Sequence, residues 1–331
     1  MDKKSKMELK SEIKNLAITK QLNILLGSGV SMPAVPLMGM VEADDDIERN
    51  NELIKIIKEV SGKLLKEDKS DHSINKTYLA YKQFLSMIIY ILNLSNSRLT
   101  PKSVNLFTTN YDLFLEKAID SLSKENRIVF NDGTNGYFKH YLDSSNYNRV
   151  VSYKGLNDNY IDEIPSINLI KPHGSINWGK DDDQILVMNE VVDNPIIVKP
   201  TGLEGQDTFL NNHFHEMLRL FQLELDKPQS VLFVIGFSFQ DNHIAKMLRR
   251  ALQNPEIMVF IFCYSDDEKA IIMDNLGITE EKYNLCVFTP CEFDKEILIE
   301  NKNQKTGEKW YSFTIESLIK ILGNTKDDCD E

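Results

Sequence analysis

Residues 21–31 are QLNILLGSGVS, an apolar run that ends in a turn of glycine and serine. An uninterrupted apolar run of this length is typical of a strand buried on both faces of a parallel sheet. The glycines permit a tight turn and a close approach of the backbone to a ligand. We therefore predict the first βα unit of a nucleotide-binding sheet. The turn lacks the third glycine of the usual G-x-G-x-x-G fingerprint, so a purely structural turn is an equally good interpretation.

Three further apolar runs end in small polar residues in the same way. They are followed by TTNYD at 108–112, by KPHGSINW at 171–178 and by GFSFQDNHI at 236–244. We also expect strands at 195–198 and 257–262, and helices at 47–65, 78–94, 113–122, 212–226 and 242–252. The alternation predicts an α/β fold, a doubly wound parallel sheet, with a smaller and mainly helical insertion. The strand ends should then converge on one crevice, where such sheets bind ligands.

The domain organisation follows from the same patterns. We predict one domain over 1–294, with a helical insertion at about 40–100 and a second insertion at about 126–165. The second insertion is rich in Asn, Asp, Gly, Ser and Tyr, which fits either an irregular, short-stranded cover over the site or a plain surface loop. Residues 295–331 form a C-terminal extension, whose acidic tail from residue 324 we expect to be disordered.

Composition excludes several classes of function. The net charge of −12 opposes direct nucleic-acid binding, which depends on clustered Lys and Arg. No apolar run approaches the roughly 18 to 20 residues of a membrane span, so we expect a cytoplasmic protein. The 4 cysteines lack any spacing that could close a tetrahedral zinc site, and we expect no metal.

Three polar residues at the predicted strand ends can carry chemistry. Asn110 and Asp112 offer an amide and a carboxylate to ribose hydroxyls or to an amide-bearing ligand, although both residue types also cap helices. His173 lies in a turn, where an imidazole can act as a general base at neutral pH, although a lone histidine is more often structural. The other histidines lack such a context.

Taken together and in order, the four strand ends GSGVS, TTNYD, KPHGSINW and GFSFQDNHI resemble the sirtuin-like family, in particular its bacterial antiphage-defence branch. The resemblance spans about residues 23–264 and implies a Rossmann-like sirtuin core whose substrate is NAD⁺. Matched motif by motif, it implies phosphate contacts from Gly27, Ser28, Gly29 and Ser31, and adenosine contacts from Gly236 and Ser238. Asn110 would orient the nicotinamide ribose or an attacking water, with Asp112 near the carboxamide, and His173 would be the base.

The resemblance also implies an activity and partners. We expect an NAD⁺ hydrolase that releases nicotinamide and ADP-ribose in antiphage defence, as a homo-oligomer that assembles with a HerA-type ATPase. Two alternatives stay open: an NAD-sensing or scaffold subunit without turnover, and a protein deacylase. Residues 32–37 lack the Pro-x-Phe-Arg stretch of deacetylases, and the zinc ribbon is also missing, which argues against deacylation. Pro172 replaces the leucine common in this branch, which bears on the backbone before His173.

Overall fold

The computed structural model describes residues 3–68, 70–95, 100–153, 163–199, 212–280, 282–302 and 307–323. Its centre is a seven-stranded sheet in the order β11-β10-β9-β1-β2-β6-β3, in which every pair is parallel. The strands are β1 (Gln21–Leu26), β2 (Ser103–Thr108), β3 (Val129–Asn131), β6 (Ser166–Ile170), β9 (Ser230–Ile235), β10 (Met258–Phe262) and β11 (Leu285–Phe288). The predicted doubly wound parallel sheet is confirmed.

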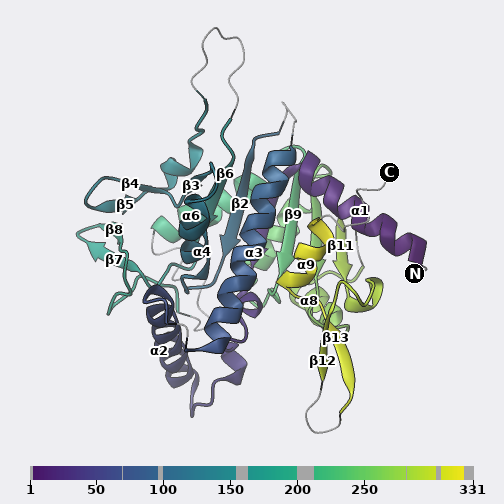
Figure 1. Cartoon of the computed structure of the whole chain (residues 1–331), viewed down its shortest axis with the longest axis horizontal. Coiled ribbons are helices and arrows are strands. Elements are labelled where there is room, and N and C mark those ends of the chain that lie inside the picture. The colour runs from purple at the N-terminus through teal and green to yellow at the C-terminus, as the bar shows by residue number, and fades with distance from the viewer. Residues whose placement is uncertain are drawn as a thin grey trace.

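Helices cover both faces of this sheet, which explains why its inner strands are apolar on both sides. One face carries α1 (Lys3–Thr19), α3 (His72–Leu94), α4 (Phe114–Ser123) and α9 (Ile315–Leu322), and their buried residues share one core with Leu22 and Ile24. The other face carries α6 (Asn212–Leu225), α7 (Asn242–Ala251) and α8 (Glu268–Leu276), which share a second core with Leu25. Figure 1 shows α3 crossing in front of the central strands.

A row of buried asparagines runs across the sheet on the α6 side. Asn23, Asn105 and Asn168 stand opposite one another on β1, β2 and β6. Each amide donates to the next: Asn168 Nδ2 to Asn105 Oδ1 and Asn105 Nδ2 to Asn23 Oδ1, both at 2.8 Å. Asn131 on β3 extends the row with a bond of 3.2 Å to Asn168 Oδ1. These bonds satisfy polar groups that would otherwise be costly in the interior.

In the range of about 40–100, predicted as a helical insertion, the chain forms α2 (Asp46–Leu65) and α3, and two short 3₁₀ helices, η1 (Ser28–Ser31) and η2 (Met38–Met40), come before α2. Asp45 begins α2, since its side chain accepts a hydrogen bond from the Glu48 N–H at 2.7 Å. Asp71 caps α3 in the same manner. The periodic patterns at 47–65 and 78–94 therefore predicted both helices, and α3 begins earlier than expected.

A smaller antiparallel sheet, in the order β4-β5-β8-β7, stands beside the main one (Figure 1). Its strands are β4 (Thr134–Asn135), β5 (His140–Leu142), β7 (Trp178–Asp181) and β8 (Gln184–Val187), and η3 (Ser144–Asn148) follows β5. Of the range 126–165, predicted as an insertion, the described residues form β3 of the main sheet, β4, β5 and η3, and residues 154–162 lie outside the described ranges. A separate hairpin joins β12 (Ile299–Lys302) to β13 (Lys309–Ser312), after η4 (Pro290–Glu292).

One expected strand is wrong. Residues 195–198 do not join the main sheet, and the segment forms only an isolated antiparallel bridge between Gly174 and Ile197. Its N–H groups are bonded to the turn after β6, because Val198 N donates to His173 O and Ile196 N donates to Trp178 O, both at 2.9 Å. The apolar run is therefore a brace for the His173 turn. The tail from residue 324 lies outside the described ranges.

Within the described ranges, no helix combines the length and apolar composition that crossing a bilayer requires.

Candidate functional site

The order of the strands places a topological switch point between β1 and β9. From β1 the chain first builds β2, β3 and β6 on one side, and it returns to build β9, β10 and β11 on the other. Open α/β sheets bind ligands at the carboxyl ends of the strands at such a point. The turns after β1 and β9 meet there, since Gly29 N donates to Gly236 O at 3.0 Å.

The predicted glycines are required by this meeting of two turns. A Cβ at Gly27 would lie 2.1 Å from Gly236 O, and one at Gly236, whose φ is +66°, would lie 2.8 Å from the Val30 backbone nitrogen. Close backbone packing thus accounts for both residues, as the structural alternative held. The helix expected at this turn is a single 3₁₀ turn, η1, which lies within GSGVS.

A cavity of about 460 Å³ opens over these strand ends. It brings together residues from four separate turns, as the sequence predicted: Ser28, Ser31, Asn110, Asp112, His173 and Ser238 all line it. Gly27, Gly29 and Gly236 form the backbone beside it. Leu53 and Ile57 of α2 also line the cavity, so the helical insertion covers the site. None of the described residues of 126–165 lines it.

Asn110 is held by its nitrogen and leaves its oxygen unpartnered. Asn110 Nδ2 donates to Gly27 O at 3.0 Å and to Ser31 Oγ at 3.1 Å. Asn110 Oδ1 is buried and has no hydrogen-bond partner in the part of the chain that the structure describes. A buried acceptor without a partner costs about 1–3 kcal/mol. The side chain is therefore fixed in orientation and offers a hydrogen-bond acceptor to a ligand.

Tyr81 of α3 extends this network and is not among the residues predicted from the sequence. Its hydroxyl lies 2.9 Å from Ser31 Oγ and 3.4 Å from Asn110 Nδ2. Because the single hydroxyl hydrogen of Ser31 goes to Asp112, Tyr81 donates its hydrogen to Ser31. Burial raises the pKa of Tyr81 well above its usual value, with the Asp112 charge adding to the effect, so the phenol keeps its proton. A tyrosine among apolar helix positions was the available signal, since buried hydroxyls need partners.

Asp112 belongs to the same hydrogen-bond network. Its Oδ2 accepts the Ser31 hydroxyl at 2.7 Å, and its Oδ1 accepts the Phe114 N–H at 3.3 Å. The capping alternative thus holds in part for Asp112, because the second bond satisfies the start of α4. Burial raises the pKa of the Asp112 carboxyl, while the Lys171 ammonium and the Ser31 hydroxyl act in the opposite direction.

His173 is buried and faces another histidine. Its Nε2 lies 2.9 Å from Nε2 of His243, in the first turn of α7. One ring must donate and the other accept, so the pair restricts which nitrogen of His173 carries the proton. His243 has no role among the residues predicted from the sequence, although it belongs to the same GFSFQDNHI stretch as Ser238. Its place just after a strand end was the signal.

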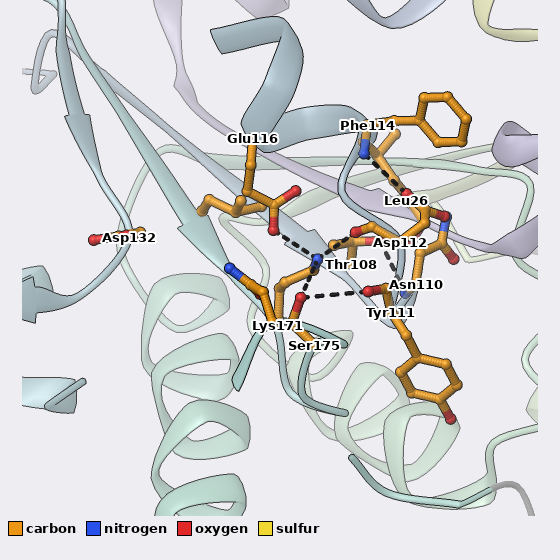
Figure 2. A network of polar contacts seen from close by, with 12 residues as sticks. Leu26, Thr108, Asn110, Tyr111, Asp112, Phe114, Glu116, Asp132, Lys171 and Ser175 are labelled. Carbon is orange, nitrogen blue, oxygen red and sulfur yellow. Dashed lines mark hydrogen bonds and ion pairs between the residues drawn. The ribbon is translucent and has the colours of Figure 1, made fainter. Parts of the chain in front are cut away.

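Lys171 links the turn after β2 to the turn after β6. In Figure 2, dashed lines converge on its ammonium. Its Nζ donates to the main-chain oxygen of Asp112 at 2.6 Å, to Glu116 Oε1 at 2.7 Å and to Ser175 Oγ at 3.0 Å. The side chain is 3% exposed, so this ion pair is buried on the lysine side. Desolvation raises the pKa of Glu116, and Lys171 opposes that rise. Lys171 therefore fixes the turn that leads to His173.

Over the described ranges, no group of three or more His, Cys, Asp or Glu side chains could hold a metal ion. The polar groups at the strand ends are amides, hydroxyls, the carboxylates of Asp112 and Asp241, and the imidazoles of His173 and His243. Such a set suits recognition of a hydroxyl- and amide-bearing organic ligand.

The fold and this site define a doubly wound α/β protein with a ligand cavity at its switch point. Among families of known proteins, the model of the SIR2-like domain matches residues 104–288, which is more than half of the chain. The protein therefore belongs to the SIR2-like domain family, whose members are NAD-utilising enzymes. A search of curated proteins gave no significant match.

Proposed function

We propose that the protein is an NAD⁺ hydrolase that cleaves the bond between nicotinamide and ribose. The observation that supports this most is Asn110, which lines the cavity together with His173 and whose buried Oδ1 has no hydrogen-bond partner among the described residues. An acceptor fixed in this way can orient a ribose hydroxyl or a water, and a neighbouring imidazole can take up its proton. Family membership and the cavity at the switch point agree with NAD⁺ as the substrate.

The proposed reaction assigns a task to each side chain. The C1′–N bond breaks and its electron pair leaves with nicotinamide, while a water oxygen forms a new bond to C1′ and its proton passes to His173. Asn110 holds the water or the ribose, and Asp112 accepts a hydrogen bond from the carboxamide N–H₂. Ser28, Ser31 and the Gly27 and Gly29 backbone contact the phosphates, and Gly236 and Ser238 contact the adenosine side. The buried walls exclude other water and strengthen these polar contacts.

An isotope experiment tests this proposal against both alternatives. Purified protein is incubated with NAD⁺ in ¹⁸O-water, with and without an acetyl-lysine peptide. We expect nicotinamide and ADP-ribose that carries one ¹⁸O atom, in equal amounts, and no dependence on the peptide. Acetyl-ADP-ribose formed only with the peptide would favour the deacylase, and bound NAD⁺ that is never cleaved would favour the sensor.

We further propose that the protein acts in the cytoplasm in antiphage defence, by depleting NAD⁺, and works as a homo-oligomer with a HerA-type ATPase. This proposal rests on the resemblance of the four strand-end motifs to that branch of the family. Light scattering of the purified chain, alone and mixed with such an ATPase, tests it. A monomer under both conditions would contradict it.

A further inference from the structure

A second cavity, of about 370 Å³, lies between α4 and the smaller sheet. Its walls include Glu116 of α4, Phe130 of β3, Trp178 of β7 and Val187 of β8. It shares no lining residue with the cavity at the switch point. Its volume lies at the lower end of the range of small-molecule sites, about 300–1,000 Å³. We call it the α4 cavity.

Two buried acceptors belong to residues that line the α4 cavity. Asn177 is 6% exposed, and its Nδ2 donates to Met188 O at 2.8 Å, which identifies the other atom of the amide as oxygen. That oxygen, Asn177 Oδ1, has no partner among the described residues, and neither has Glu116 Oε2. Each unmet acceptor costs about 1–3 kcal/mol, which a ligand carrying N–H donors would recover.

The charges around the α4 cavity favour a cation. Carboxylates of Glu116, Asp120 and Asp132 line it, against the single ammonium of Lys171. The three donors of Lys171 are already taken up by Glu116 Oε1, Asp112 O and Ser175 Oγ. Asp132 is oriented at the cavity by Thr134, because its Oδ1 accepts both the N–H and the hydroxyl of that residue. Asp120 also pairs with Lys124 at 3.8 Å on the exposed side of α4, but among the described residues that line the cavity no ammonium hydrogen remains for an anion.

We propose that the α4 cavity binds a small organic cation, an amidinium or ammonium group carried on a flat apolar body. The N–H groups of the cation bond to Glu116 Oε2 and Asn177 Oδ1, and the body lies among Phe130, Leu169 and Trp178. The Glu116 carboxylate then divides its charge between the ligand and Lys171.

Binding in the α4 cavity reaches the switch-point site through one side chain. Lys171 lines the α4 cavity, and its Nζ holds the main-chain oxygen of Asp112, which lines the other cavity. A cation beside Glu116 weakens the Glu116–Lys171 pair and so loosens the Asp112 and His173 turns. This coupling rests on the proposed function, whereas binding of the cation does not.

Calorimetric titration of the full chain with three probes of one shape tests the binding: benzamidine as the cation, benzamide as the neutral form and benzoate as the anion. We expect saturable binding of benzamidine at least tenfold tighter than that of benzamide, and no binding of benzoate. Equal affinities for the three probes, or the reverse order, would overturn the proposal.

Two variants with a larger side chain in the α4 cavity test whether the probe binds there. Val187→Phe fills it from β8, and Ser123→Trp fills it from the exposed end of α4, where folding is less affected. Both should abolish benzamidine binding, whereas Glu125→Gln, at an exposed carboxylate just beyond α4, should leave it unchanged. Benzamidine binding that persists in folded Ser123→Trp would show that the cation sits elsewhere.

The coupling has its own readout. Saturating benzamidine should weaken NAD⁺ binding severalfold in the wild-type chain and leave it unchanged in Ser123→Trp. Unaltered NAD⁺ affinity would remove the coupling. If NAD⁺ is not cleaved, the proposed function is refuted, but binding of the cation in the α4 cavity is still tested by the benzamidine titration.

Discussion

At the scale of single residues, the pair of His173 and His243 makes the sharpest prediction. With Nε2 atoms 2.9 Å apart, His243 sets the tautomer and the direction of the proposed base. His243→Ala should lower kcat for NAD⁺ cleavage by about tenfold to a hundredfold and change KM little, because the base stays present but is no longer oriented.

The conservative variant separates orientation from packing. His243→Gln keeps a hydrogen-bonding amide and should recover part of the lost kcat. His215→Ala, an exposed histidine on α6, is the matched control and should leave kcat unchanged. A kcat that is the same in wild type, His243→Ala and His243→Gln would contradict the role given to His243.

His213 predicts a pH dependence of stability. Burial beside Trp178 lowers its pKa from 6.5 to about 4, with Glu216 and Asp143 opposing the shift. Between these two pH values the unfolded chain binds the proton more strongly, so stability is lost as the pH falls from 6.5 toward 4. A shift of this size corresponds to roughly 3 kcal/mol. In His213→Phe that loss should disappear, as urea unfolding at several pH values would show.

The control for this measurement is His72→Gln, because His72 is exposed at the start of α3. Its stability should follow the wild-type pH curve. The same acid loss in His213→Phe as in wild type would exclude His213 as its source.

At the scale of secondary-structure elements, the asparagine row ties the central strands together. Asn105 donates to Asn23 Oδ1 and to Glu224 Oε2, and accepts from Asn168. Asn105→Leu would leave these groups unpaired in the interior and should destabilise the protein by about 2–4 kcal/mol. Asn131→Ala, at the half-buried edge of the row, should cost less. Equal losses in urea unfolding would contradict the cooperative row.

The same scale shows what the sequence could predict. Each buried strand carried its own signal, an apolar run that stopped at small polar residues, so four strand ends and the switch-point site followed from local patterns. The pairing of β5 with β8 could not be predicted in this way, because a tight histidine turn and the whole of β6 separate them. The strand predicted at residues 195–198 was wrong for a different reason, because an apolar run does not show whether a segment joins a sheet or packs against a turn.

Tyr81 and His243 were missed because their roles depend on distance in space. Tyr81 fits the apolar period of α3, and only the path of that helix over the turn after β1 brings its hydroxyl to Ser31. His243 looks like an ordinary residue of a first helical turn, because only the fold brings the chain after β9 to the turn after β6, two strands away across β1 and β2, where His243 meets His173. Sequence patterns identify what a side chain can do, and the topology decides what it meets.

At the scale of the whole molecule, two cavities flank one lysine. The switch-point cavity contains the groups for a hydrolytic step, and the α4 cavity has acceptors and negative charge. Lys171 touches the walls of both, and its ion pair with Glu116 stabilises the arrangement. Removing one partner of such a buried pair costs about 3–5 kcal/mol, so this connection is part of the folded core.

The central claim is that Asn110 and His173 act on NAD⁺, and the rate of nicotinamide release in Asn110→Ala tests it most directly. The variant loses both the amide nitrogen contacts and the Oδ1 acceptor, so we predict a fall of about a hundredfold or more, with NAD⁺ still bound and thermal stability close to that of wild type. Nicotinamide release by Asn110→Ala at the wild-type rate would contradict the account.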